Sequence, residues 1–166
     1  DTAAAYGESE AILGRALDGV PRDSYVLCTK FTSERRGVTE DDPVKGAQEL
    51  IESVERSLRR LGTDHLDLLQ LHGVAPTLYR AIRDRFVPVM RQLQAQGKIR
   101  FLGLTESFAA DEERATLRQA LADDLFDTLM VGYNLLTPGP EDWVLPEARH
   151  TDVGILVMCA VRRKIG

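Results

Sequence analysis

The stretch LDLLQLH, residues 66–72, decides which fold this sequence can adopt. Apolar side chains occupy most of its positions, and it ends on a histidine. Nearly continuous apolar character over a strand-length run is typical of a strand covered on both faces, as in a parallel sheet. The sequence therefore predicts a parallel sheet of five such strands. The other four runs are SYVLCTK (24–30), IRFLGLT (99–105), FDTLMVGY (126–133) and DVGILVMC (152–159).

Helical patterns lie between these runs. In the clearest, 44–61, hydrophobic residues recur at helical spacing, and Gly62 stands where a C-cap glycine belongs. A second pattern covers 78–96 and ends at Gly97, with Pro88 predicting a kink or a break inside it. Shorter helices are expected over 8–18, 111–123 and 141–150.

Strict alternation of helices and strands indicates an α/β fold built from right-handed βαβ units. Two architectures compete, an open doubly wound sheet and a closed (β/α)₈ barrel. A barrel needs eight strands and typically about 250 residues, so length alone favours the open sheet. The sequence contains neither G-x-G-x-x-G nor G-x-x-x-x-G-K-[ST], the two common phosphate-binding patterns.

Composition narrows the function classes. The chain has 166 residues, a net charge of −5 and 43% hydrophobic residues, which favours one folded domain over residues 1–166 and no nucleic-acid partner. No apolar run approaches the roughly 18 residues of a membrane helix. The two cysteines, Cys28 and Cys159, form neither a disulfide framework nor a metal-binding spacing, so we expect no metal and a cytoplasmic location.

Polar residues follow the predicted strands at the ends where parallel α/β folds build their sites. A lysine after a strand is usually a solvated surface residue, and a histidine is as often packed as functional. Two such residues at corresponding strand ends strengthen the functional interpretation of both. The strand-end residues are Lys30, His72, Thr105, Glu106, Tyr133, Asn134 and Cys159.

The first ten residues, DTAAAYGESE, have the pattern of a loop that leads into a helix beginning near Glu8. In an alternating fold, a strand should precede this helix. We therefore expect Asp1 to stand at the end of a strand upstream of the sequence, on the same rim as Lys30 and His72. On this interpretation the chain is a fragment.

Four stretches together resemble the aldo-keto reductases in order, spacing and strand-end placement. They are DTAAAYGESE (1–10), TK (29–30), LDLLQLH (66–72) and GKIRFLGLT (97–105). The resemblance runs through essentially the whole chain and implies a partial (β/α)₈ TIM barrel. Residues 1–166 would run from the end of strand 2 through strand 7, with about five of eight strands present and the N- and C-terminal parts missing. The last stretch is most similar to the sugar-dehydrogenase side of the family, such as L-galactose dehydrogenase.

The resemblance implies a catalytic tetrad of Asp1, Tyr6, Lys30 and His72. Carbonyl reduction needs a hydride at carbon and a proton at oxygen. A phenol is a weak acid, with a reference pKa of about 10, and a nearby ammonium lowers the pKa of a phenol. Lys30 would supply this ammonium, Asp1 would keep Lys30 charged, and Tyr6 would give the proton. His72 would orient the carbonyl and stabilise charge on its oxygen.

The resemblance also implies a nicotinamide dinucleotide, usually NADPH, as the hydride donor, bound without a glycine-rich motif. Where the family has Ser-Asn after its fifth strand, this sequence has Thr105 and Glu106, and Glu106 is acceptor-only and adds a negative charge. A common glutamine aligns with Met130. The stacking aromatic residue aligns with Met158, which Cys159 follows. These departures suggest altered cofactor geometry and make NAD a second candidate.

The favoured function is thus an oxidoreductase that interconverts a small-molecule carbonyl (aldehyde, ketone or sugar) and an alcohol. Because a barrel without three strands has open edges, we expect the fragment alone to be inactive. One alternative is a nicotinamide-nucleotide-binding regulatory or sensor barrel without significant catalysis. Another is an unrelated α/β domain in which the four tetrad residues do not converge. Substrate, reaction direction and oligomeric state stay open.

Overall fold

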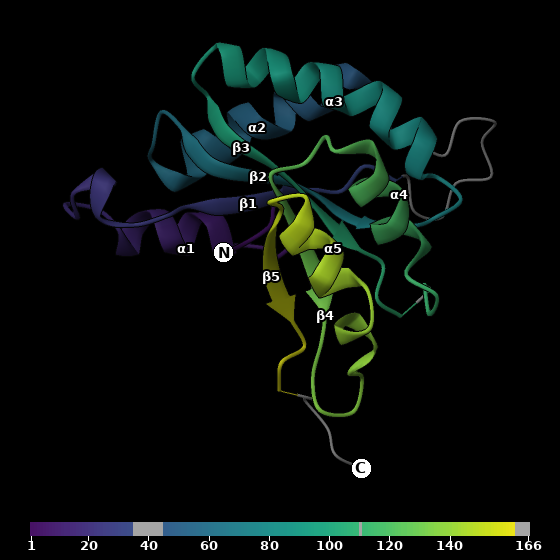
Figure 1. The fold of residues 1–166 in the computed structure, drawn as a ribbon. Coiled ribbons are helices and arrows are strands. Elements are labelled where there is room, and N and C mark those ends of the chain that lie inside the picture. Colours follow the sequence, from purple (N-terminus) through teal and green to yellow (C-terminus); the bar gives the residue numbers. More distant parts are fainter. Residues whose placement is uncertain (35–44, 110, 162–166) are drawn as a thin grey trace.

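The structure, a computed structural model, describes residues 1–34, 45–109 and 111–161. Within them, five parallel strands form one sheet, and helices alternate with the strands (Figure 1). This confirms the predicted fold class. The strands are β1 (Cys28–Phe31), β2 (Leu66–Val74), β3 (Ile99–Glu106), β4 (Thr128–Gly132) and β5 (Gly154–Met158). The helices are α1 (Ser9–Ala16), α2 (Ala47–Leu61), α3 (Tyr79–Ala95), α4 (Ala115–Asp123) and α5 (Val144–His150), with short 3₁₀ helices at Arg22–Ser24 and Gly139–Glu141.

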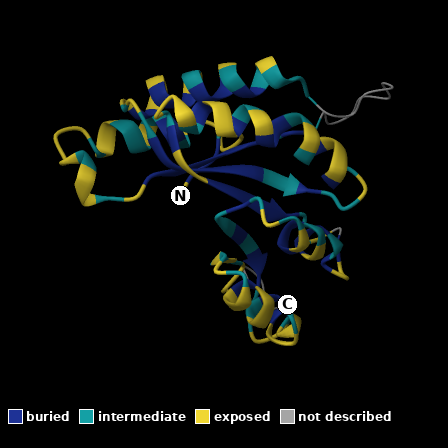
Figure 2. Cartoon of the chain, turned by 45° about the horizontal axis from the view of Figure 1, so that its top comes forward, coloured by how far each residue is buried: buried dark blue, intermediate teal, exposed yellow. Residues whose placement is uncertain are grey.

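Strands that are neighbours along the chain are also neighbours in the sheet, because the strand order is β1-β2-β3-β4-β5. In an open doubly wound sheet the order reverses at a switch point, whereas in a barrel each strand follows its predecessor around the sheet. Among the described strands the order never reverses. The strands also curve along the inside of an arc whose outside carries helices (Figure 2). The structure therefore matches part of a (β/α)₈ barrel, not an open doubly wound sheet.

Two rows of side chains cross the sheet on opposite faces, because side chains alternate along each strand. The row on the inside of the arc carries polar and small residues, and the row toward the helices carries aliphatic ones. By strand register, the inner row contains Lys30, Gln70, Gly103, Thr128 and Gly154. The outer row contains Leu71, Leu104, Leu129 and Ile155. This division leaves the inner face for the site and the outer face for the core.

Gly103 lies at the centre of the inner row, where no side chain would fit. A Cβ atom at this position would lie 2.6 Å from Thr128 Oγ1 and 2.8 Å from Gln70 Cγ. These separations are shorter than ordinary van der Waals contact. The glycine therefore lets two longer polar side chains approach each other across β3.

The hydrophobic core fills the space between the outer row and the helices. Helices α2 and α3 lie side by side over strands β1 to β3 (Figure 1). Their buried faces repeat at helical spacing, as the sequence predicts. These faces contain Leu50, Val54 and Leu58 from α2, and Ile82, Phe86 and Met90 from α3.

The two long helices differ slightly from their predicted bounds. Helix α2 begins at Ala47, where the backbone N–H of Gly46 donates to Glu49 Oε2 at 2.7 Å, and it ends at Gly62 with a left-handed φ of 67°. Val44, the predicted start, lies outside the described residues.

Helix α3 runs through Pro88 as one helix of 17 residues, so the predicted break is absent. Pro88 is on the exposed side of the helix, where water can bind the carbonyl that the proline leaves without a donor. Within the described part of the chain, no helix combines the length and the hydrophobicity needed to cross a membrane.

Helix α4 begins at Ala115, later than the predicted start at residue 111. The delay has a physical cause, because the Asp111 carboxylate accepts hydrogen bonds from the backbone N–H groups of Ala115 and Thr116, both at 2.8 Å. Asp111 therefore caps the helix from outside it.

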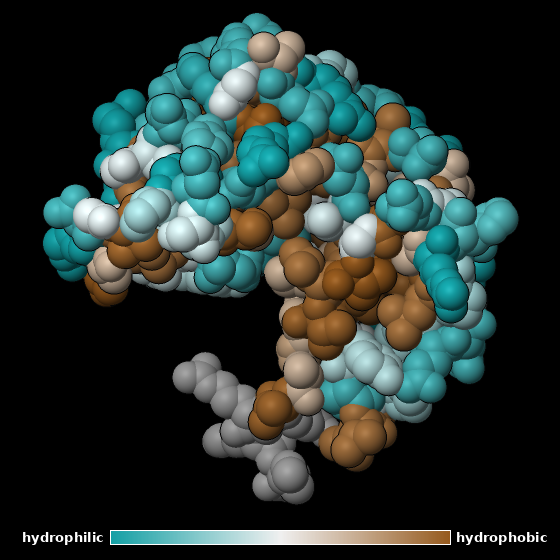
Figure 3. Space-filling model, turned by 60° about the vertical axis from the view of Figure 1, so that its left-hand side comes forward, coloured by the Kyte–Doolittle hydropathy of each residue, from teal (hydrophilic) through white to brown (hydrophobic). Residues whose placement is uncertain are grey.

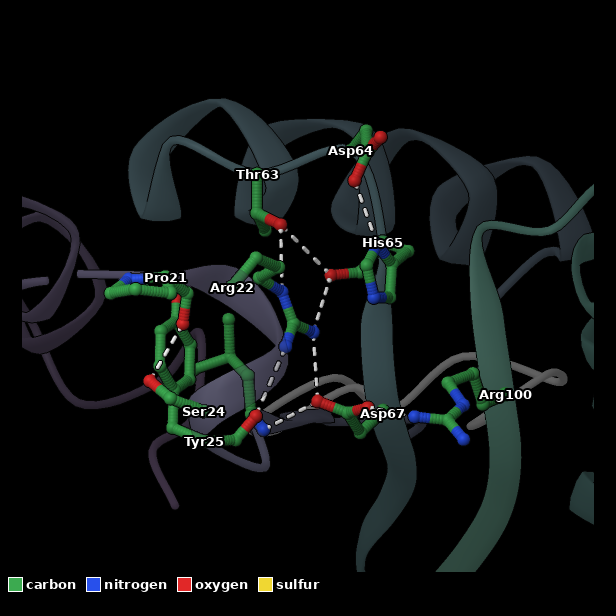
Figure 4. A network of polar contacts seen from close by, with 10 residues as sticks. Pro21, Arg22, Ser24, Tyr25, Thr63, Asp64, His65, Asp67 and Arg100 are labelled. Carbon is green, nitrogen blue, oxygen red and sulfur yellow. Dashed lines mark hydrogen bonds and ion pairs between the residues drawn. The ribbon is translucent and has the colours of Figure 1, made fainter. Parts of the chain in front are cut away.

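The amino end of β2 carries a polar network around Asp67 (Figure 4). Asp67 is 3% exposed, and its carboxylate accepts hydrogen bonds from Arg22 at 2.7 Å, Arg100 at 2.9 Å and the backbone N–H of Leu27 at 2.8 Å. Burial raises the pKa of Asp67, but these three donors outweigh burial and lower it overall. The network joins β2 to β3 and to the segment before β1.

The inner side of the arc is open. Figure 3 shows it as a wide hollow, with hydrophobic residues along part of its wall. Phe101 lies on the same face of β3 as Gly103 of the inner row, and it is 47% exposed although it belongs to a strand of the sheet. The inner face of the described sheet is therefore accessible from outside.

Candidate active site

An ion pair links the first residue of the chain to β1. Lys30 Nζ lies 2.7 Å from Asp1 Oδ2 and donates to the carbonyl oxygen of Thr2 at 2.9 Å. The Lys30 side chain is 2% exposed, whereas that of Asp1 is 44% exposed. Asp1 thus neutralises a buried ammonium while water still reaches the carboxylate.

Tyr6 and His72 contact each other beside the ion pair of Lys30 and Asp1. The Tyr6 hydroxyl is 3.4 Å from His72 Nε2, and the two rings are nearly perpendicular, with centroids 5.5 Å apart. Lys30 Nζ is 5.2 Å from the centre of the Tyr6 ring. Tyr6 is half exposed, so its hydroxyl can meet a molecule from solvent. The structure therefore brings together the four residues expected to form the tetrad.

Backbone hydrogen bonds hold the loop that carries Asp1 and Tyr6. The N–H of Thr2 donates to the carbonyl of Cys28 at 2.9 Å, which places the loop against the edge of β1. The N–H of Tyr6 donates to the carbonyl of Ala3, also at 2.9 Å, and closes a turn. Ala3 is fully buried under this turn, and Gly7 takes a left-handed φ of 57° beyond it. The small residues around Tyr6 are therefore needed to close the turn.

The buried environment of Lys30 disfavours the charged form of its amine. Burial lowers the pKa of Lys30 from its usual value, while the Tyr6 hydroxyl and the Cys28 thiol oppose this shift. The Asp1 carboxylate, in contact with Nζ, also favours the charged form. The site thus holds a poorly solvated ammonium beside a phenol.

Gln70 is a further member of this cluster that sequence analysis missed. It is fully buried beside Lys30 in the inner row, and its Nε2 donates to Asp1 Oδ1 at 3.3 Å. The sequence signal that could have indicated Gln70 was an amide side chain in the middle of a mostly apolar strand. Gln70 helps Lys30 to fix the orientation of the Asp1 carboxylate.

A cavity of about 330 Å³ opens beside the tetrad at the carboxyl ends of the strands. It brings the tetrad together with four of the five residues expected to contact a cofactor, and the exception is Cys159. The cavity is lined by Asp1, Tyr6, Lys30, His72, Gly73, Thr105, Glu106, Met130, Val157 and Met158.

Cys159 lies outside the lining because the chain turns away after β5. Strand β5 ends at Met158, and Cys159 takes a left-handed φ of 59°. The Cys159 carbonyl accepts a hydrogen bond from Asn134 Nδ2 at 2.9 Å, and the residue is exposed. The sequence pattern could not reveal this change of direction.

Thr105 is positioned by an irregularity in the neighbouring strand. The pairing of β2 with β3 shifts register between Leu71 and Val74, and Gly73 in this bulge has a left-handed φ of 64°. The N–H of Gly73 donates to Thr105 Oγ1 at 2.5 Å. The Thr105 hydroxyl already accepts this bond, so its own hydrogen remains available to an acceptor in the cavity.

Glu106 carries a compensated charge. Sequence analysis expects this carboxylate to add a negative charge, but Arg114 Nη1 forms an ion pair with Glu106 Oε1. The backbone N–H of Gly132 donates to the same oxygen at 2.7 Å. Burial raises the pKa of Glu106, while Gly132 and Arg114 oppose the rise. Arg114 was not expected at the site, because the sequence pattern places it inside a helix over 111–123.

The cavity fits a nicotinamide ring by two criteria. Glu106 Oε2 is buried and has no hydrogen-bond partner among the described residues, so a ligand donor would satisfy it. Next to it, the Thr105 hydroxyl can donate. Met130 and Met158 offer apolar, polarisable surface on β4 and β5. The described residues include no cluster of three or more His, Cys, Asp or Glu side chains suited to a metal ion.

Fold and site together define an α/β protein of the parallel barrel class, with a Tyr-His-Lys-Asp cluster at the carboxyl ends of its strands. The model of the aldo/keto reductase family matches residues 1–163. The chain belongs to this family, as the sequence resemblance predicts.

Individual relatives agree with this assignment. The chain is 33% identical over 169 residues to the NADH-specific methylglyoxal reductase of Escherichia coli (strain K12), an alignment that covers 95% of this chain and 49% of that protein. It is similar to the holo form of an aldo-keto reductase from Bacillus halodurans, with a TM-score of 0.75, 28% identity, and coverage of 95% of this chain and 50% of that one. It is also similar to an aldo-keto reductase from Klebsiella pneumoniae in complex with NADPH, with a TM-score of 0.68, 28% identity, and coverage of 96% and 51%. The chain thus spans about half the length of these relatives.

Proposed function

We propose that this protein is an NAD(P)(H)-dependent oxidoreductase that interconverts a small carbonyl compound and an alcohol. The observation that carries the proposal is the convergence of Tyr6, His72, Lys30 and Asp1 at one end of the cavity. Family membership and the relatives described as NADH-specific or bound to NADPH support the cofactor. The cofactor would supply the hydride, and the side chains would supply the proton and the orientation.

In this proposal Tyr6 is the proton donor. Tyr6 is half exposed and lines the cavity together with His72, and its hydroxyl is 3.4 Å from His72 Nε2, so a carbonyl oxygen can accept hydrogen bonds from both side chains. The Lys30 ammonium stabilises the negative charge that develops on the phenol oxygen when the proton leaves. Asp1 holds Lys30 in place through the ion pair, and Gln70 holds Asp1 through a hydrogen bond.

We propose that Thr105, Glu106, Met130 and Met158 hold the nicotinamide ring. Thr105 and Glu106 present one donor and one acceptor to the carboxamide group. Met130 and Met158 stand where the family commonly has a glutamine and an aromatic residue. They would pack against the nicotinamide ring through van der Waals contacts, without hydrogen bonds. NADPH is the first candidate, with NADH as the second because of the E. coli relative.

Replacement of Tyr6 by phenylalanine tests the proposal, in the longest form of the protein that its gene encodes. We expect Tyr6→Phe to reduce turnover of a small reactive aldehyde by roughly 10²- to 10⁴-fold, because the proton donor is lost. NADPH affinity should stay within about twofold, since the hydroxyl faces the carbonyl. Tyr25→Phe is the matched control, because Tyr25 packs under Arg22, outside the site.

The outcome separates the proposal from the regulatory alternative. A sensor barrel would bind NADPH equally well in both forms and show no turnover for Tyr6→Phe to reduce. Undiminished turnover in Tyr6→Phe would overturn the role of Tyr6 as proton donor.

We further propose that residues 1–166 form one domain of the barrel and turn over substrate poorly when expressed alone. The wide hollow on the inner side of the arc supports this, because water then enters the cavity. Following NADPH oxidation by residues 1–166 with a reactive aldehyde is the test. Turnover equal to that of the longest form would contradict this proposal.

A further inference from the structure

Glu10, in the first turn of α1, is a buried carboxylate that the proposed mechanism does not use. Its side chain is fully buried, whereas that of its ion-pair partner Arg60 is 46% exposed. Glu10 Oε2 lies 3.3 Å from Arg60 Nη1, and Glu10 Oε1 accepts a hydrogen bond from Thr29 Oγ1 at 2.7 Å. A leucine would fill a similar volume without the cost of removing a carboxylate from water. The contacts of Glu10, and not its bulk, therefore indicate its role.

The Thr29 contact brings Glu10 to the strand that carries Lys30. Thr29 is fully buried on β1 and directly precedes Lys30. Because side chains alternate along a strand, Lys30 points to the inner face of the sheet and Thr29 to the face covered by helices. Glu10 thus holds β1 from behind, one residue before the ammonium.

The backbone of Tyr6 is attached to the same turn of α1. The carbonyl of Tyr6 accepts a hydrogen bond from the N–H of Ser9 at 3.1 Å. Ser9 Oγ in turn accepts from Thr2 Oγ1 at 2.8 Å. Ser9 and Glu10 are adjacent in α1, so this turn connects the loop of Tyr6 to the strand of Lys30.

The Tyr6 side chain itself is held loosely. It is half exposed, and its hydroxyl is 3.4 Å from His72 Nε2, which is long for a hydrogen bond. Lys30 Nζ is 5.2 Å from the centre of its ring. The place of the phenol beside the ammonium therefore depends on the loop and on the first turn of α1. A displacement of a reacting group by about 1 Å costs on the order of 10²-fold in rate.

Building on the proposed function, we propose that Glu10 is a positioning residue for the proton transfer. Through Thr29 it fixes α1 against β1, and α1 fixes the Tyr6 loop at the separation from Lys30 that proton donation requires. Glu10 does not line the cavity, so it acts through these two segments and not on the substrate. Arg60 neutralises its charge from the solvent side.

Glu10→Leu tests the inference, because it removes both contacts at similar volume. In the longest form of the protein, the single-turnover rate of NADPH oxidation with a small reactive aldehyde should fall roughly 10- to 10²-fold. The affinity and stoichiometry of NADPH binding, measured by calorimetry, should stay within about twofold of wild type. Glu10→Gln keeps an oxygen that can accept from Thr29, so it should restore the rate to within roughly threefold of wild type.

Thr29→Val is a second variant, which decides the question even where Glu10→Leu does not fold. It keeps the branched shape of the side chain and removes the hydroxyl that Glu10 binds. Its single-turnover rate should fall roughly 3- to 30-fold. Asp67→Asn is the control for loss of stability, because its network lies at the opposite end of β2, and it should keep the wild-type rate.

The position of Tyr6 can also be followed without cofactor or turnover. In protein labelled with ¹³C at the Cζ atom of tyrosine, the Tyr6 resonance is the one that Tyr6→Phe removes. This resonance should shift in Glu10→Leu and in Thr29→Val, and it should stay in place in Asp67→Asn. An unchanged Tyr6 resonance in both Glu10→Leu and Thr29→Val would overturn the inference.

A double-mutant cycle separates positioning from a merely structural role. In a Tyr6→Phe background, Thr29→Val and Glu10→Leu should lower the residual rate by less than about twofold, because no proton donor is left to misplace. If they lower the residual rate by the same factor as in wild type, their effect does not pass through Tyr6. The positioning role is then overturned.

The outcomes also distinguish this inference from the proposed function. If Tyr6→Phe keeps full turnover, the proposed function of Tyr6 fails, and the inference fails with it. If Tyr6→Phe loses turnover while Thr29→Val and a folded Glu10→Leu keep the wild-type rate, only the role of Glu10 is overturned.

Discussion

Lys30 shows how a residue that we propose to act in catalysis can cost stability. Its ammonium is buried, and burial lowers its pKa despite the contact with Asp1. Lys30→Met should reduce turnover by roughly 10²- to 10⁴-fold, because the charge beside Tyr6 is lost. The free energy of unfolding at neutral pH should change by less than about 1 kcal/mol, since water hydrates the exposed Asp1 and an apolar side chain replaces a buried ion. Enzyme assays and urea unfolding measure the two effects.

The pH dependence of Lys30→Met provides a second check. Between the native pKa of Lys30 and its usual value of about 10.4, the unfolded wild type binds more protons than the native state. Wild type should therefore gain stability relative to the variant as the pH rises through this window. Lys98→Met is the control, because Lys98 forms a surface ion pair with Glu55. A loss of more than about 3 kcal/mol in Lys30→Met would show instead that the ion pair stabilises the fold.

Asp67 gives the opposite pH dependence at the other end of β2. Its native pKa is lowered, so its stabilising contribution is full above the unfolded pKa of about 3.9 and is lost as the pH falls through the native pKa. Asp67→Asn should lower the free energy of unfolding by about 2 kcal/mol at neutral pH. This difference from wild type should shrink in acid. Urea unfolding across the pH range measures it, and a difference that grows in acid would contradict this assignment.

Strand-end positions could be predicted from the sequence, while contacts between distant segments could not. Lys30 and His72 were predictable because the carboxyl ends of parallel strands meet at one edge. Gln70 and Arg114 were not. Gln70 lies mid-strand, where an amide usually only disrupts an apolar pattern. The contact of Arg114 with Glu106 depends on a left-handed turn that hydrophobic spacing does not encode.

At the scale of elements, the spacing of hydrophobic residues predicted each of the five strands and five α-helices that the structure describes. Capping side chains then shifted the ends of some helices from their predicted positions. The start of α4 depends on the Asp111 side chain, which pattern reasoning placed inside the helix. At Pro88 the side chain expected to end a helix does not do so, because this proline is on the solvent side of a packed helix. Element ends are thus determined by single side chains, whereas element identity is determined by the repeat of buried residues.

Helices α1 and α2 touch at Gly14, where two physical effects compete. Helix propensity predicts that Gly14→Ala stabilises α1 by about 1 kcal/mol. A Cβ atom at Gly14, however, would lie 2.3 Å from the carbonyl oxygen of Arg60, which belongs to the backbone of α2 and cannot rotate away. We expect the clash to prevail and the variant to unfold about 1–3 kcal/mol more easily, as measured by thermal or urea unfolding.

Gly139→Ala is the matched control for this contact. A Cβ at Gly139 would meet nothing within 4 Å apart from its chain neighbours, and its backbone is not left-handed. Because Pro140 follows and restricts the residue before it, this variant should stay within about 1 kcal/mol of wild type. If Gly14→Ala proved more stable than wild type, this would contradict the prediction and show that α1 and α2 can move apart without a loss of stability.

For the whole molecule, strand order is the feature that length and composition could not predict. Length favoured an open sheet, because 166 residues are few for a barrel. The barrel order became an expectation only through the resemblance of spaced motifs to a family. Its physical expression is the unreversed order β1 to β5, in which Lys30, His72 and Thr105 lie toward the carboxyl ends of three neighbouring strands and line one cavity.

The two edges of this sheet should differ in stability. Residues 2–4 cover β1 through hydrogen bonds to Cys28 and Lys30, whereas β5 pairs only with β4 among the described strands. In residues 1–166, amide hydrogen exchange should therefore be slowest in β2 and β3 and fastest in β5. Because Met158 on β5 lines the cavity, a saturating nicotinamide nucleotide should slow exchange in β5 more than in β2. Mass spectrometry of exchanged peptides measures both effects, and equal protection of β5 and β3 without ligand would show that another surface already covers this edge.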